Sequence, residues 1–228
     1  MTKKILVLED EDNIRSFVVI NLKRAGYETV EFSNGEDAVK YMTEHDDVAV
    51  AVLDVMLPGM DGYEVCRRIR SHGSKAGIIM LTAMSQEIDK LTGFTSGADD
   101  YVVKPFSVVE LTARIDALYR RVWGNSFSTE IISSGPFELD TRSRSLKKDN
   151  IKIELTQVEY LIIKYFLENK GKALSRDDIL KTVWGAEYQG DYKIVDVNIR
   201  RLRLKIEEDA ALPKYISTVW GYGYKWEA

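Results

Sequence analysis

The sequence has few residues that form covalent cross-links or bind transition metals. The single cysteine, Cys66, excludes an intramolecular disulfide and fits a reducing cytoplasm. The two histidines, His45 and His72, show no zinc-ligand or catalytic-triad spacing. No apolar run approaches the roughly 18 to 20 residues of a membrane span, and residues 1–5 lead into a strand pattern without room for a signal peptide. We therefore expect a cytoplasmic protein with no membrane partner.

The length and the charge distribution indicate two domains. A chain of 228 residues exceeds one typical domain. Residues 1–121 carry a net charge of −5, whereas residues 122–228 carry +1. A slightly basic half supports nucleic-acid binding only weakly, and the positions of its cations matter more. Residues 122–130 lack periodicity and are rich in small polar residues, which predicts a linker between a domain at 1–121 and a domain at 131–228.

Strand and helix patterns alternate through the first domain. The run 48–53 is apolar at every position, which predicts a strand buried on both faces in the middle of a parallel sheet. Further strands are predicted at 4–8, 27–31, 77–81 and 100–103, and helices at 13–25, 34–42, 61–70, 85–96 and 107–121. Five strands alternating with five helices predict an α/β fold with a doubly wound parallel sheet.

Polar side chains stand at the carboxyl ends of these strands, where open α/β sheets hold their ligands. Glu9 and Asp10 follow the first strand, Asp54 ends the central one, and Thr82 and Lys104 follow the last two. Convergent carboxylates repel one another without a cation, and oxygen ligands alone favour Mg²⁺. A divalent ion, a lysine and a hydroxyl around one aspartate make a site for a transferring phosphoryl group. The alternative is that Asp54 only caps the next helix or starts a turn.

Four segments carry a resemblance to a known family. They are Leu8–Asp10, Leu53–Pro58, Leu81–Ala83 and Gly97–Phe106, and together they resemble the receiver domain of two-component response regulators. The resemblance covers essentially all of residues 3–121 and implies a flavodoxin-like fold. It also implies that Asp54 accepts a phosphoryl group from a sensor histidine kinase.

The same resemblance assigns further roles in the first domain. It implies Mg²⁺ bound by Glu9, Asp10, Asp54 and the backbone carbonyl of Met56. Lys104 would pair with the Asp54 carboxylate or with the phosphoryl oxygens. Thr82 and Tyr101 would take the switch roles, in which the hydroxyl moves onto the phosphoryl group and the aromatic ring turns inward behind it. The alternative for Tyr101 is a half-buried aromatic residue of a strand.

The second domain shows short strands, three helices and a terminal hairpin. Strands are predicted at 137–140, 145–147 and 151–155. Helices are predicted after the capping box Thr156–Glu159, after Ser175 and around 193–206. A hairpin with a glycine-containing turn is predicted at 216–226. The third helix carries five cations against one acid. This order predicts an α+β winged helix-turn-helix whose third helix enters the major groove of DNA. The alternative is that the cations form a solvated helix face.

Residues 155–161 and 195–203 resemble the DNA-binding domain of OmpR/PhoB-type response regulators. The resemblance implies binding to double-stranded DNA at direct repeats. The implied contact residues are Lys193, Asn198, Arg200, Arg201, Arg203, Thr218 and Tyr222. Trp220 stands where family members often carry arginine, so we expect weaker minor-groove readout and a salt dependence shallower by about one charge.

The resemblance also implies a homodimer that forms on phosphorylation through a helix–strand–helix face of the receiver. The implied intersubunit ion pairs are Lys90 with Glu110 and Asp100 with Arg114. A third acidic position holds Thr95, which leaves Arg121 without that partner. Because one exposed pair contributes about 0.2–1 kcal/mol, we expect a somewhat weaker dimer.

These observations predict a DNA-binding response regulator that is switched by phosphorylation of Asp54 and is not an enzyme for external substrates. One alternative is a phosphorylation-independent DNA-binding regulator whose receiver only dimerises. Another is a metal-dependent phosphatase with an aspartate nucleophile, but such enzymes need a second aspartate where this chain has Met56. Met56 and Met84 flank the predicted phosphoryl site, and two apolar thioethers predict slow self-dephosphorylation.

Overall fold

The computed structural model describes residues 4–83, 96–123, 131–185, 188 and 191–228, with side chains to residue 119 in the second range. The chain divides into two compact units, Met1–Gly124 and Asn125–Ala228, and each is considered by itself. No helix within the described ranges is long and apolar enough to cross a membrane.

The first unit is built on a five-stranded parallel sheet in the order β2-β1-β3-β4-β5. Its strands are β1 (Lys4–Leu8), β2 (Glu28–Phe32), β3 (Val48–Asp54), β4 (Gly77–Thr82) and β5 (Asp100–Val103). Every residue of β3 and β4 is buried, as uniformly apolar central strands require. The prediction of a doubly wound parallel sheet with 48–54 at its centre is confirmed.

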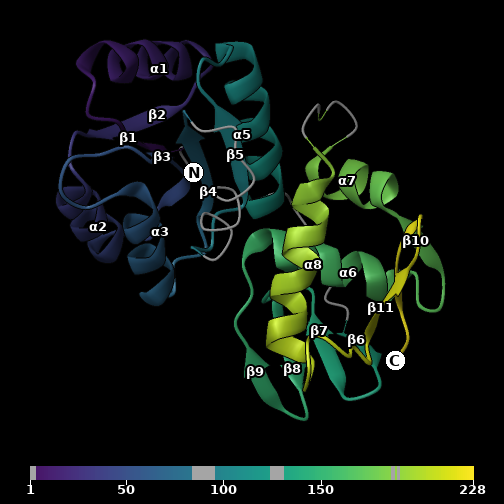
Figure 1. Cartoon of the computed structure of the whole chain (residues 1–228). Coiled ribbons are helices and arrows are strands. Elements are labelled where there is room, and N and C mark those ends of the chain that lie inside the picture. Colours follow the sequence, from purple (N-terminus) through teal and green to yellow (C-terminus); the bar gives the residue numbers. More distant parts are fainter. Residues whose placement is uncertain (1–3, 84–95, 124–130, 186–187, 189–190) are drawn as a thin grey trace. The chain divides into compact units, whose positions relative to one another are not determined.

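Helices cover both faces of this sheet. They are α1 (Asp12–Arg24), α2 (Gly35–Glu44), α3 (Gly62–Ser71) and α5 (Val108–Trp123). Figure 1 shows α2 and α3 on one side of the sheet, and α1 and α5 on the other. Asn34 and Asp61 cap α2 and α3, and their side chains accept hydrogen bonds from Asp37 N and Glu64 N. The helix predicted at 85–96 lies outside the described residues except for its last position.

The second unit contains two antiparallel sheets and three helices. The strands of the first sheet follow the order β6 (Ile131–Ser134), β7 (Phe137–Asp140), β8 (Ser145–Lys148) and β9 (Ile151–Ile153). The strands of the second sheet follow the order β10 (Ala173–Ser175), β12 (Gly223–Trp226) and β11 (Ile216–Val219). The helices are α6 (Gln157–Glu168), α7 (Arg176–Trp184) and α8 (Lys193–Ile206). This arrangement is that of a winged helix. The short strands β6 and β10 were not predicted.

The predicted capping box at the start of α6 is present. Glu159 N donates to Thr156 Oγ1 at 3.3 Å, and Thr156 N donates to Glu159 Oε2 at 2.7 Å. The core below α6 is aromatic, because Phe137, Phe166 and Trp226 are buried with ring centroids 5.2 and 6.4 Å from the Trp226 ring. These contacts attach the terminal hairpin to the first sheet and to α6.

Candidate functional site

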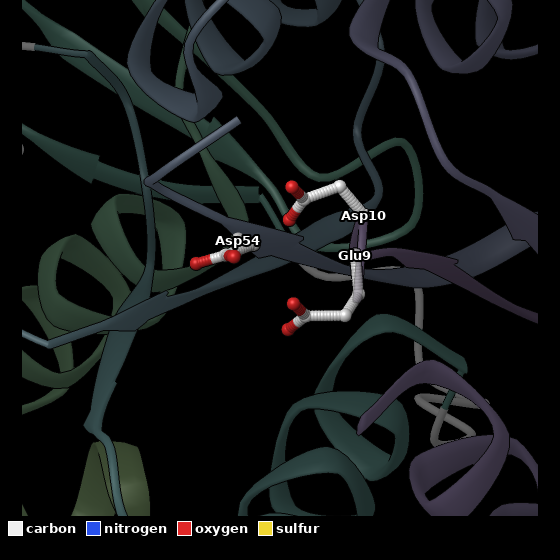
Figure 2. Close-up of side chains that lie close together, drawn as sticks. All are labelled: Glu9, Asp10 and Asp54. Atoms are coloured by element: carbon white, nitrogen blue, oxygen red, sulfur yellow. The ribbon is translucent and has the colours of Figure 1, made fainter. Parts of the chain in front are cut away.

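Three carboxylates converge at the carboxyl edge of the parallel sheet. Glu9 and Asp10 follow β1, and Asp54 ends the neighbouring strand β3. One carboxylate oxygen from each lies within 4.8 Å of the others, and Figure 2 shows the three side chains directed toward a common space. Glu9 is 0% exposed and Asp54 2%, whereas Asp10 is partly exposed. The sequence prediction that these residues come together is confirmed, and Asp10 is the most accessible of them.

Lys104 joins two of these carboxylates. It follows β5, and Lys104 N donates to Thr82 O at 2.7 Å, which fixes its backbone at the end of β4. Its Nζ lies 2.9 Å from Asp54 Oδ2 and 2.7 Å from Glu9 Oε2. The predicted pairing with Asp54 is present, and the contact with Glu9 is additional. One ammonium shared by two buried carboxylates leaves a net negative charge in the cluster.

Burial and this charge imbalance perturb the cluster's titration. Burial raises the pKa of Glu9 to about 7, and the Asp54 carboxylate adds to the rise against the opposing effect of Lys104. Burial alone would lower the pKa of Lys104, but its hydrogen bonds to Glu9 and Asp54 outweigh that effect and raise it. The ammonium form of Lys104 is therefore stabilised, while the ionised form of Glu9 is disfavoured.

The donor set fits a hard divalent cation. Glu9 Oε1 is buried and has no hydrogen-bond partner within the described residues, so one oxygen of the cluster remains available as a ligand. Carboxylate oxygens without nitrogen or sulfur donors favour Mg²⁺ and similar ions. Met56 N donates to Asp54 Oδ1 at 3.3 Å, and the Met56 side chain is 57% exposed. A cation here would neutralise the excess negative charge.

Two residues outside the predicted site, Arg15 and Gly62, hold this edge in place. Arg15 Nη1 donates to the carbonyl oxygens of Glu9 and Asp10, at 2.7 and 3.3 Å. A Cβ at Gly62 would lie 2.0 Å from the carbonyl oxygen of Asp54, so only glycine lets α3 begin against the end of β3. Gly62 belongs to a glycine-rich loop that is visible in the sequence, but nothing in the sequence distinguishes Arg15 from other helix arginines.

The predicted switch residues occupy the neighbouring strands. Thr82 ends β4, beside β3, and is 3% exposed. Tyr101 lies on β5 opposite Met80 and packs, half buried, against the core cluster of that face. Thr82 therefore stands on the strand next to Asp54, whereas Tyr101 lies one strand further along the sheet, and their switch roles remain predictions.

The predicted dimer residues make contacts within a single chain. Arg114 Nη1 lies 3.0 Å from Asp100 Oδ2, and Arg114 Nη2 lies 2.7 Å from Glu110 Oε1. An intersubunit pair between Asp100 and Arg114 would have to share or exchange these contacts. The other predicted partner, Lys90, lies outside the described residues, as do Met84, Thr95 and the side chain of Arg121.

The basic helix of the second unit presents only some of its predicted contact residues. Lys193 and Arg200 are exposed, and Arg201 is partly exposed. The Arg203 guanidinium instead donates to Ile216 O at 2.7 and 3.0 Å and to Thr218 Oγ1 at 2.9 Å. Arg203 therefore connects α8 to β11 of the hairpin.

Asn198 is not on the exposed face of α8. It is 1% exposed, and its Nδ2 donates to Ile194 O at 2.8 Å within the same helix. Its Oδ1 accepts a hydrogen bond from Arg201 Nη1 at 3.4 Å, and its contact with DNA remains a prediction. In the hairpin turn, by contrast, Tyr222 is 48% exposed.

Comparisons with known proteins agree with both units. Residues 5–116 match the family model described as response regulator receiver domain, and residues 150–226 match the model described as transcriptional regulatory protein, C terminal. The structure of the response regulator DrrB, a Thermotoga maritima OmpR/PhoB homologue, is 35% identical, with all of both chains covered and a TM-score of 0.53. A mutant of RitR is 28% identical over 99% of this chain and 100% of its own, with a TM-score of 0.79.

Proposed function

Because the chain belongs to the OmpR/PhoB family of two-component response regulators, we propose that phosphorylation of its receiver controls its DNA-binding domain. A sensor histidine kinase donates the phosphoryl group to Asp54. The phosphorylated receiver forms a homodimer, and the dimer binds direct repeats in double-stranded DNA. The observation that carries this proposal is the acidic cluster of Glu9, Asp10 and Asp54, in which Lys104 is hydrogen-bonded to the acceptor carboxylate.

The chemistry follows from the two oxygens of Asp54. Oδ2 is held by Lys104 and Oδ1 by Met56 N, so the carboxylate is oriented before the donor arrives. An Asp54 oxygen attacks phosphorus, the phosphorus–nitrogen bond of the kinase phosphohistidine breaks, and the imidazole leaves with the bonding electron pair. Lys104 then faces the negative phosphoryl oxygens.

Glu9, Asp10, Asp54 and the Met56 carbonyl would hold Mg²⁺, which when bound neutralises charge on the phosphoryl oxygens. Since Lys104 already occupies one oxygen of Glu9 and one of Asp54, metal binding and the position of Lys104 are coupled. In our proposal Thr82 and Tyr101 transmit the change from the Asp54 side of the sheet toward β5. The Asp100–Arg114–Glu110 contacts lie on that same edge, where they can be exchanged between subunits, and Lys90 would join them.

For DNA recognition we propose direct contacts by Lys193, Arg200, Arg201 and Tyr222. Arg203 and Thr218, which bond to each other, hold the hairpin against α8 and add contacts to the DNA backbone from that position. We expect no turnover of external substrates, and we expect slow loss of the phosphoryl group because Met56 offers no group that orients water.

The test is DNA binding by the full chain with and without a small-molecule phosphodonor in Mg²⁺. The probe is a duplex that the wild-type chain selects from a random-sequence pool, and Asp54→Asn is the matched control. We expect the phosphodonor to tighten binding by the wild type and to leave Asp54→Asn unchanged. Equal binding under all four conditions would instead establish the phosphorylation-independent regulator.

A further inference from the structure

A large apolar side chain stands fully exposed at the turn of the terminal hairpin. Trp220 is 91% exposed, and no other large hydrophobic side chain in the described residues is as exposed. The described indoles of Trp184 and Trp226 are 2% and 0% exposed. Leaving an indole in water forgoes the stabilisation that its burial would provide, so contact with a partner would recover part of it.

The backbone that carries Trp220 is held tightly. Tyr222 N donates to Val219 O at 3.0 Å across the turn, and Gly221 adopts a positive φ of 71° that closes it. Arg176 N donates to Tyr222 O at 3.2 Å, which attaches the turn to the start of α7. The exposed indole therefore projects from a fixed support.

The same hairpin is fixed to the basic helix. Besides the contacts of Arg203 with β11, Tyr224 OH donates to Asp196 Oδ1 at 2.7 Å, and Arg176 Nε donates to the same oxygen at 2.7 Å. Tyr224 belongs to β12, Asp196 to α8 and Arg176 to α7. When the cations of α8 bind one groove of a duplex, these contacts determine where the hairpin turn lies relative to that duplex.

We propose that Trp220 is a minor-groove wedge, which inserts its indole beside the major groove bound by α8. This inference rests on the proposed DNA-binding function and adds a residue and a mode of contact to it. Apolar side chains that enter the minor groove partly unstack a base step and bend the duplex. The indole has no charge, so its contribution does not depend on counterion release. Its single N–H donor matches the adenine N3 and thymine O2 acceptors, which favours A·T pairs.

The first test measures DNA affinity against salt concentration for the full chain. The probe is a duplex that the wild type selects from a random-sequence pool, and the variants are Trp220→Ala, Trp220→Phe and Trp220→Arg. We expect Trp220→Ala to weaken binding about tenfold without changing the salt slope. Trp220→Phe should retain most of the affinity, and Trp220→Arg should steepen the slope by about 0.9. Ile151→Ala, which truncates a 72% exposed side chain on β9, should change neither quantity.

The second test follows the indole itself. Acrylamide quenches the fluorescence of exposed tryptophans, and the quenching that Trp220→Phe removes is that of Trp220. DNA should suppress this part of the quenching in the wild type. Energy transfer between dyes at the duplex ends should report a smaller bend with Trp220→Ala than with the wild type.

The outcomes separate this inference from the function on which it rests. If the wild type binds the selected duplex and Trp220→Ala binds and bends it equally well, the proposed wedge is overturned and the DNA-binding function stands. Unchanged quenching of Trp220 in the complex would overturn it as well. If the wild type selects no duplex, with or without the phosphodonor, the proposed function fails and the wedge fails with it.

Discussion

Replacing Glu9 by glutamine should stabilise the metal-free receiver, even though it removes an ion pair with Lys104. Glu9 is fully buried, and its Oε1 has no hydrogen-bond partner within the described residues. Burial and the nearby Asp54 carboxylate together disfavour its ionised form more than Lys104 favours it. Glutamine has nearly the same shape and carries no charge, so the variant keeps the packing and removes the buried charge.

The magnitude follows from linkage between protonation and folding. The pKa of Glu9 rises from its ordinary value of 4.5 to about 7 in the folded domain. The folded state therefore binds more protons than the unfolded state between these values, and the wild type loses stability as the pH rises through this window. Integration gives a total loss of about 3 kcal/mol, of which about 2 kcal/mol falls between pH 5.5 and pH 8. Glutamine does not titrate, so Glu9→Gln is spared this loss.

The assay is unfolding of the full chain in a chelator at pH 5.5 and at pH 8, followed by circular dichroism. The two units can unfold separately, and the receiver transition is the one that added Mg²⁺ shifts in the wild type. Glu31→Gln, which alters an exposed carboxylate on β2, is the control and should change stability by less than about 0.5 kcal/mol. Mg²⁺ should stabilise the wild type more than Glu9→Gln, because the variant lacks one carboxylate ligand.

A stability difference between Glu9→Gln and wild type that is the same at both pH values would refute the reasoning. So would a variant that is less stable than the wild type at pH 8 without metal. Either result would mean that Lys104 compensates the buried charge of Glu9 and that the cluster does not require a cation.

Two further substitutions test other parts of the account. Gly62→Ala places a Cβ 2.0 Å from the Asp54 carbonyl oxygen. The variant should lose about 1–3 kcal/mol of unfolding free energy, measured in urea, and should be phosphorylated at Asp54 more slowly. Stability and phosphorylation rate equal to those of the wild type would contradict this expectation. Arg203→Ala removes the hydrogen bonds to Ile216 O and Thr218 Oγ1. It should weaken DNA binding at least about tenfold, measured by fluorescence anisotropy. A change of less than about twofold would show that the hairpin holds its position without Arg203.

The sequence predicts the receiver fold well because the apolar residues follow a different pattern in its strands than in its helices. The run 48–53 is apolar at every position, and the structure places it at the centre of the sheet with every residue buried. Polar residues at the strand ends predict the acidic cluster, because carboxyl ends of parallel strands meet at one edge. The contact of Lys104 with Glu9 is not predictable in this way, since it depends on side-chain positions across β3 and β4.

The second unit was predicted less completely. The segment Ile131–Ser134 of β6 has two apolar residues followed by two polar ones, so it shows no period-2 pattern. The strand β10 is defined by its pairing with distant β12. The burial of Asn198, by contrast, is predictable from the sequence. Asn198 lies four residues after Ile194 and four before Leu202, both buried, so helical periodicity already places it on the core side. The prediction followed the basic neighbours on the helix and not this phase.

The central claim is that Asp54 is a phosphoryl acceptor controlled by the surrounding cluster. The most direct test is the intact mass of the full chain after incubation with Mg²⁺ and a small-molecule phosphodonor, beside Asp54→Ala, with size-exclusion chromatography of the same samples. The account predicts the gain of one phosphoryl group by the wild type alone, together with a shift to the dimer. No gain in mass by the wild type, or an equal gain by Asp54→Ala, would contradict it.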